Sequence, residues 1–190
     1  MHPEHNSGKY IFGFWVYLMT DLIMFAALFA AFAALRISTF GGPTMKEIFD
    51  LPQIMIETLI LLMSSFTCGL AMLAVFRGKK KLSFLWFGVT FILGLAFLIL
   101  ELSEFRHLIN DGQSWTRSAF LSSYFALVGT HGLHIAVGLL WILVGLYQIK
   151  TRGLTPFISS KLVRFSLFWH FLDIVWIFIF TFVYLMGVAT

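Results

Sequence analysis

The stretch Ala119–Ile149, AFLSSYFALVGTHGLHIAVGLLWILVGLYQI, decides the fold, because it is one long apolar run without a charged residue. A helix needs about 20 such residues to cross a hydrocarbon core of ~30 Å. Four other runs have a similar length and composition. They lack the alternating pattern of a membrane barrel, so strands are not expected. The sequence therefore predicts an all-α integral membrane bundle of five transmembrane helices, at about residues 11–35, 54–76, 82–100, 119–149 and 162–188.

The segments outside these runs are short. Residues 1–10 form a polar tail that lacks the basic region of a signal peptide, so the first run is expected to be a retained helix. We find no internal repeat and no linker long enough to divide domains. Residues 11–190 are therefore expected to form a single five-helix transmembrane domain.

The composition excludes most soluble proteins. Hydrophobic residues make up 59% of the chain and charged residues only 12%, whereas about a quarter of an average soluble chain is charged. The net charge of +4 does not indicate nucleic-acid binding, since the basic residues gather between apolar runs. A single cysteine, Cys68, allows no disulfide within the chain.

The basic residues also predict an orientation. Cytoplasmic loops of membrane proteins carry an excess of Lys and Arg. Nine of these residues fall on the side of the N-terminus: Lys9, Arg77, Lys79, Lys80, Lys81, Lys150, Arg152, Lys161 and Arg164. Four fall on the other side: Arg36, Lys46, Arg106 and Arg117. This predicts a cytoplasmic N-terminus and a periplasmic C-terminus.

Several ionisable residues lie inside the apolar runs or just beyond their ends, where each requires a partner or a function. They are Asp21, Glu57, Glu101, Glu104, His131, His134, His170 and Asp173. Without Lys or Arg at their depth, Asp21 and Asp173 must be protonated, hydrogen-bonded to histidine or hydroxyl groups, or open to water. Glu57 and Glu101 lie near the outer ends of their helices, where we expect water to reach them.

The spacing of the histidines suggests a polar seam. His131 and His134 are three residues apart, as are His170 and Asp173, so each pair shares a helix face. If the fourth and fifth helices pack antiparallel, these four residues could form one seam, with Gly132 and Gly138 allowing close approach. The seam could be a hydrogen-bonded clasp, a haem site with one histidine from each helix, or a proton or ion path.

Soluble-enzyme chemistry is not indicated. There is no HExxH zinc motif, phosphate loop, GxGxxG or nucleophile elbow. We therefore expect no catalytic residue, no metal and no bound cofactor on this chain.

Three stretches add a resemblance. THGLH at Thr130–His134, FWHFLDIVW at Phe168–Trp176 and ELSEF at Glu101–Phe105 resemble subunit III of the haem–copper oxidases. Within that family, GFWVYLMTD ending at Asp21 and GGPTMKEIFDLP at residues 41–52 look closest to the cytochrome o ubiquinol oxidase. Asp21 matches a buried carboxylate of that family, although longer members have Glu there and two further helices ahead of it.

The resemblance implies an accessory subunit. The complex would oxidise ubiquinol, reduce oxygen and pump protons in a bacterial inner membrane, with haem and copper in its largest subunit, subunit I. This chain would bind phospholipid and support that core subunit. A haem-bearing membrane anchor and a small proton-coupled transporter using Asp21 and Asp173 are the alternatives.

Overall fold

A computed structural model describes residues 4–36 and 51–185. Over these residues it contains helices and no strand, in the order α1 (Glu4–Leu35), α3 (Leu51–Phe76), α4 (Lys80–Asn110), α5 (Ala119–Arg152), α6 (Pro156–Ile179) and the π-helical turn η1 (Phe180–Leu185). Five helices are long and apolar enough to cross a membrane, the last formed by α6 and η1 together. The prediction of five apolar helices is confirmed, and the chain is a multi-pass membrane protein.

The helix ends differ from the predicted ones mainly where polar residues continue a helix. The third helix was expected to end at Leu100 but runs on to Asn110. Its last turns carry charged residues, which lowered the hydropathy without breaking the helix; His107 Nδ1 lies 2.8 Å from Asp111 Oδ2, four residues later. The fifth helix begins at Pro156 rather than Leu162, and its expected end at Val188 lies outside the described residues.

Local sequence fixes two tight turns. Gly78 follows α3 with a φ of 66° and Gly153 follows α5 with a φ of 74°, and such left-handed residues end helices readily because glycine lacks a Cβ. After Gly153, the Thr155 side chain accepts a hydrogen bond from the Ile158 backbone N–H at 3.3 Å, with proline next to it in the first turn. These turns make α3 and α4, and α5 and α6, antiparallel neighbours.

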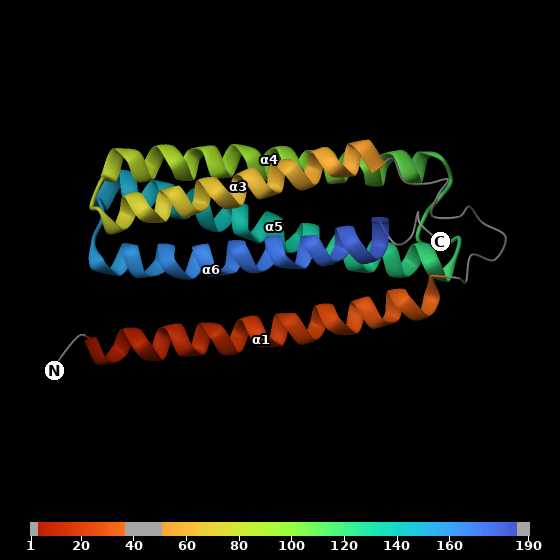
Figure 1. Ribbon diagram of the computed structural model, residues 1–190, viewed down its shortest axis with the longest axis horizontal. Helices are drawn as coiled ribbons and strands as arrows, with labels where there is room; N and C mark the ends of the chain where they lie inside the picture. Colours follow the sequence, from red (N-terminus) through yellow and green to blue (C-terminus); the bar gives the residue numbers. More distant parts are fainter. Residues whose placement is uncertain (1–3, 37–50, 186–190) are drawn as a thin grey trace.

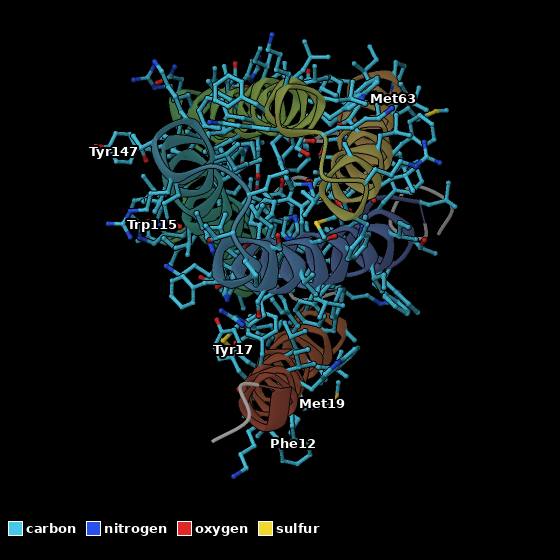
Figure 2. All side chains as sticks on the ribbon, turned by 90° about the vertical axis from the view of Figure 1, so that its left-hand side faces the viewer. Phe12, Tyr17, Met19, Met63, Trp115 and Tyr147 are labelled. Carbon is cyan, nitrogen blue, oxygen red and sulfur yellow. The ribbon has the colours of Figure 1, made fainter. Side chains whose placement is uncertain are left out.

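The helices form a four-helix bundle with one helix added. Helices α3, α4, α5 and α6 enclose a common interior, and α1 lies outside it against α5 and α6 (Figure 1). The start of α1 and the turns at Gly78 and Gly153 lie at the same end of the molecule. Side chains such as Phe12, Met19, Met63 and Tyr147 project outward (Figure 2). Apolar residues thus lie on both the inside and the outside, as expected in lipid.

One buried tryptophan of α6 contacts the three other helices of the bundle. Trp169 of α6 is completely buried and its indole N–H donates to Ser64 Oγ of α3 at 2.9 Å. A Cβ placed on Gly94 of α4 or on Gly138 of α5 would come within 2.8 Å of the indole ring. Two glycines therefore open the space that lets α6 contact all three other helices of the bundle.

Candidate functional site

Asp21 and His134 form a pair between α1 and α5. Asp21 is 9% exposed, and its Oδ2 lies 3.8 Å from His134 Nε2. The other ring nitrogen, His134 Nδ1, lies 2.7 Å from the Thr130 carbonyl oxygen. Tyr17 lies on α1 one turn before Asp21. The pair joins α1 to the bundle.

His131 points into the bundle instead. It is completely buried, its ring stacks on Trp176 with centroids 5.2 Å apart, and Phe97 meets it edge-on at 6.1 Å. Neither ring nitrogen has a hydrogen-bond partner in the part of the chain that the structure describes. His131 is thus an imidazole enclosed by aromatic rings, one turn from His134 but in different surroundings.

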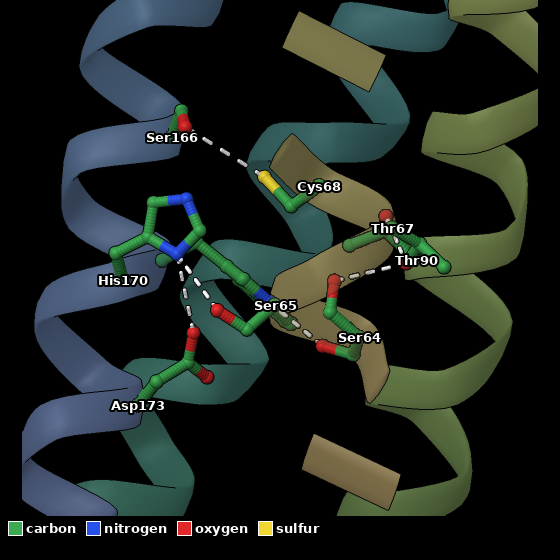
Figure 3. Close-up of polar contacts among 9 residues, drawn as sticks. Ser64, Ser65, Thr67, Cys68, Thr90, Ser166, His170 and Asp173 are labelled. Atoms are coloured by element: carbon green, nitrogen blue, oxygen red, sulfur yellow. Dashed lines mark hydrogen bonds and ion pairs between the residues drawn. The ribbon is translucent and has the colours of Figure 1, made fainter. Parts of the chain in front are cut away.

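His170 and Asp173 form a second pair, between α6 and α3. His170 Nδ1 lies 2.8 Å from Ser65 Oγ and 3.5 Å from Asp173 Oδ2. Figure 3 shows both contacts on the same ring nitrogen. The Asp173 side chain is 8% exposed and that of His170 is 40% exposed. The acid is therefore inside the bundle and the imidazole at its surface.

Hydroxyl groups extend this second pair across the interior. Thr67 Oγ1 lies 2.9 Å from Thr90 Oγ1 of α4 and donates to the Ser64 carbonyl oxygen, also at 2.9 Å. Cys68 Sγ contacts Ser166 Oγ at 3.8 Å. Figure 3 shows these side chains as one layer linking α3, α4 and α6. Hydrogen bonds of this kind hold helices together in lipid, where apolar contact alone gives little preference.

Three carboxyl groups form a third assembly toward the other end of the bundle, which we call the carboxyl cluster: Glu57, Glu101 and Glu104. Glu57 and Glu101 are 0% and 1% exposed, and Glu101 interacts electrostatically with both other acids. Tyr124 Oη donates to Glu104 Oε1 at 3.0 Å. The Glu101 carboxyl group lies against α5, where a Cβ on Gly132 would be 2.9 Å from it.

The structure separates residues that the sequence analysis had grouped. The expected seam of His131, His134, His170 and Asp173 does not form as one network. His134 contacts α1 and His170 contacts α3, because the two helices present those side chains to different neighbours. The expectation that water reaches Glu57 and Glu101 is also wrong, since both are enclosed by the bundle.

Several polar residues of these assemblies were missed at the sequence level. They are Ser64, Ser65, Thr67 and Thr90 in the hydroxyl layer and Tyr124 and Tyr184 beside the carboxyl cluster, whose hydroxyl oxygens are 3.0 Å apart. The run Ser64–Ser65 with Thr67 and Cys68 inside an otherwise apolar helix was the available signal.

Comparison with known proteins places the chain in a family. The family model described as cytochrome c oxidase subunit III matches residues 2–188. The chain belongs to the cytochrome c oxidase subunit III family. It is 56% identical to the cytochrome bo(3) ubiquinol oxidase subunit 3 of Pseudomonas aeruginosa over 186 residues, 98% of this chain and 89% of that protein.

Relatives in this family differ in the electron donor that their names state. Quinol oxidase subunit 3 of Bacillus subtilis is 48% identical over 190 residues, 100% of this chain and 93% of that protein. Cytochrome c oxidase subunit 3 of Bacillus sp. strain PS3 is 45% identical over 191 residues, 98% of this chain and 92% of that protein. Membership of the family alone therefore does not fix the donor.

The described part of this family member contains no group of three or more His, Cys, Asp or Glu side chains able to hold a metal ion. The polar side chains are instead arranged in pairs and layers, each joining two or more helices. This arrangement supplies polar contacts between helices inside an apolar medium.

Proposed function

We propose that this chain is the accessory, non-catalytic subunit III of a cytochrome bo(3)-type ubiquinol oxidase. The observation that carries the proposal is the 56% identity, over nearly the whole of both chains, to a protein named as that subunit. On this proposal the complex oxidises ubiquinol and reduces oxygen while pumping protons. Haem, copper and the ubiquinol site belong to other subunits, the metals to catalytic subunit I.

The geometry favours this role over a haem-bearing anchor. A haem between α5 and α6 would need one histidine from each helix facing a common space. His134 instead faces α1, and His170 is held toward α3 by Ser65. His131 is completely buried against Trp176 and Phe97, so its ring nitrogens do not open onto a space that could hold a porphyrin.

A proton-coupled transporter receives less support for a similar reason. Asp21 lies at the contact of α1 with α5, whereas Asp173 lies at the contact of α6 with α3. Within residues 4–36 and 51–185, no hydrogen bond or ion pair connects the two pairs. Because each acid lies at a different contact between helices, the arrangement favours two structural contacts over a single proton pathway.

A groove beside α1 is suited to the phospholipid that we propose for this subunit. Ala26, Phe29, Ala30 and Ala33 line one side, and Phe178 and Phe182 line the other, around a volume of about 390 Å³. Arg36 lies at one end of the groove. An apolar channel with a guanidinium at its mouth matches an acyl chain below a phosphate.

We further propose that the protein is a single domain in a bacterial inner membrane, with residues 1–10 in the cytoplasm. The first turn of the bundle, around Lys79, and the second, around Arg152, lie at the same end as the start of α1. The nine basic residues of that side therefore gather at one face, as expected of the cytoplasmic side.

Purification of the native complex tests the proposal. A tag on this chain should retain a haem- and copper-containing subunit, and the preparation should consume oxygen with ubiquinol as donor. Removing this chain should leave the haem spectrum of the remaining subunits in place. Retention of no haem protein would refute the proposal, and activity with reduced cytochrome c instead of ubiquinol would correct the donor.

A further inference from the structure

His170 differs from the other ionisable side chains in the middle of the described helices. The side chains of Asp21, His134 and Asp173 are 12%, 16% and 8% exposed, and His131 is completely buried. The His170 side chain is 40% exposed, although it lies near the middle of the apolar span Pro156–Leu185. An exposed imidazole at that depth would meet hydrocarbon if lipid alone surrounded it.

The exposed part of His170 is a hydrogen-bonding atom. Ser65 Oγ and Asp173 Oδ2 both contact Nδ1. Nε2 is the other ring nitrogen in Figure 3. Among residues 4–36 and 51–185 it has no hydrogen-bond partner, and it is not one of their buried unpaired atoms. Ser65 and the buried acid thus fix the ring through Nδ1 and leave Nε2 on its exposed part.

The surface around Nε2 is otherwise apolar and open. On α3, Leu62 lies three residues before Ser65 and Gly69 four residues after it, and on α6 Ile174 lies four residues after His170. Leu62 is 44% and Ile174 54% exposed. A Cβ on Gly69 would have no atom within 4 Å, so a helix could approach α3 closely along Ser65 and Gly69.

Lipid chains cannot satisfy such a surface. In hydrocarbon an unpaired hydrogen-bonding group is costly, whatever the protonation state of the imidazole. We propose that the α3/α6 face, defined by Leu62, Ser65, Gly69, His170 and Ile174, is where subunit III docks on the catalytic subunit. The partner is a transmembrane helix that presents a hydrogen-bonding side chain to His170 Nε2.

This inference rests on the proposed function, because that function supplies the partner. The inference adds which face of subunit III contacts the catalytic subunit. The broad apolar face of α5, with Leu133 at 64% and Leu140 at 64% exposed, offers lipid an acceptable surface without a polar group. Compared with this face of α5, the α3/α6 face carries an exposed imidazole and therefore needs a protein neighbour.

Two substitutions separate the outward contact from the internal one. His170→Asn places an amide near the position of Nδ1, so it keeps the contact with Ser65 but removes Nε2. Ser65→Ala removes the internal contact and keeps Nε2. Loss of one hydrogen bond in lipid should reduce retention of the catalytic subunit by about fivefold or more in His170→Asn. Ser65→Ala should retain more of it than His170→Asn.

Photo-crosslinking in the intact complex tests the face without depending on stability. A photoreactive side chain at Leu62 or Ile174 should crosslink to the catalytic subunit, and one at Leu133, an exposed control on α5, should not. Crosslinks from Leu133 alone would overturn the docking face while leaving the proposed function intact. Failure of the wild-type chain to retain any oxidase subunit would refute the proposed function itself.

Discussion

The surroundings of His134, which faces Asp21, determine which of its ring nitrogens carries a proton. A carbonyl oxygen only accepts hydrogen bonds, so the 2.7 Å contact with the Thr130 carbonyl requires that His134 Nδ1 carry a proton. In a neutral imidazole, Nε2 is then an acceptor. Asp21 Oδ2 faces it from 3.8 Å, beyond hydrogen-bond distance, so the two groups attract each other as charges or dipoles and not through a direct hydrogen bond.

This geometry predicts different outcomes for two substitutions of Asp21. Asp21→Asn keeps the shape and an N–H donor for Nε2, so the complex should assemble and retain most of its initial rate. Asp21→Ala leaves His134 Nε2 without the polar group that faces it, at a cost of about 1–3 kcal/mol. We expect it to loosen the attachment of α1 and shorten the working life of the complex, measured as progressive inactivation during turnover.

His134→Leu is the matched control for this pair. Because Asp21→Ala and His134→Leu remove the same contact, combining them should cost less than the sum of the two single changes. If Asp21→Asn lost proton pumping from the first turnover while quinol oxidation stayed intact, Asp21 would be assigned to proton movement instead.

Among the elements, α6 depends most on close packing, through Trp169. Gly138→Ala would put a methyl group 2.8 Å from the Trp169 ring, and both are held by their helices. Overpacking of this kind costs about 1–3 kcal/mol. We therefore expect the purified complex carrying Gly138→Ala to lose this subunit at a lower temperature than the wild type, followed by subunit content after heating.

Gly88→Ala is the control for that experiment. Gly88 is also within a helix of the bundle, but a Cβ there would meet no atom within 4 Å. Alanine favours helix over glycine by about 1 kcal/mol, so Gly88→Ala should be neutral or slightly stabilising. Equal losses from both changes would mean that glycine at these positions does not serve the Trp169 contact.

The elements themselves were predictable where apolar length decides them. Runs of the required length predicted five helices. The fourth run begins at Ala119, where α5 begins, and in the structure Ser118 caps that helix. The end of α4 was missed because Glu101, Glu104 and Arg106 lower the hydropathy. Hydropathy measures where lipid would accept a side chain, and it does not measure where helical hydrogen bonding stops.

The polar assemblies were less predictable because they depend on the rotation of each helix about its own axis. Spacing correctly grouped His170 with Asp173. It could not tell whether α6 presents that pair to α5 or to α3, and the hydroxyl groups on α3 settle the question in the structure. Which neighbour each helix face contacts depends on how the helices pack, and the spacing of residues in one sequence does not predict that packing.

For the whole molecule, the testable property is orientation in the membrane. We predict that the turn at Lys79 faces the cytoplasm and the segment around Thr116 faces the periplasm. Both residues are exposed, and the only native cysteine, Cys68, is buried. In a Cys68→Ala background, an impermeant thiol reagent should label Thr116→Cys in intact spheroplasts. It should label Lys79→Cys only after the membrane is opened.

The reverse labelling pattern would invert the proposed topology. Reporter fusions at the same two positions provide an independent measurement, since the nine-to-four division of basic residues is the sole ground for the orientation.

The π-helical turn at Phe180–Leu185 has a consequence for how this chain can change in length. A single π turn in an α-helix accommodates one extra residue. Deleting the exposed Phe182 should therefore convert the turn to regular helix while Tyr184 still faces Tyr124. The same deletion within α6, at Ile174, would rotate every later side chain by about 100°. Near its end the chain thus has a site where an insertion or deletion changes the length of a helix without changing which side chains face the bundle.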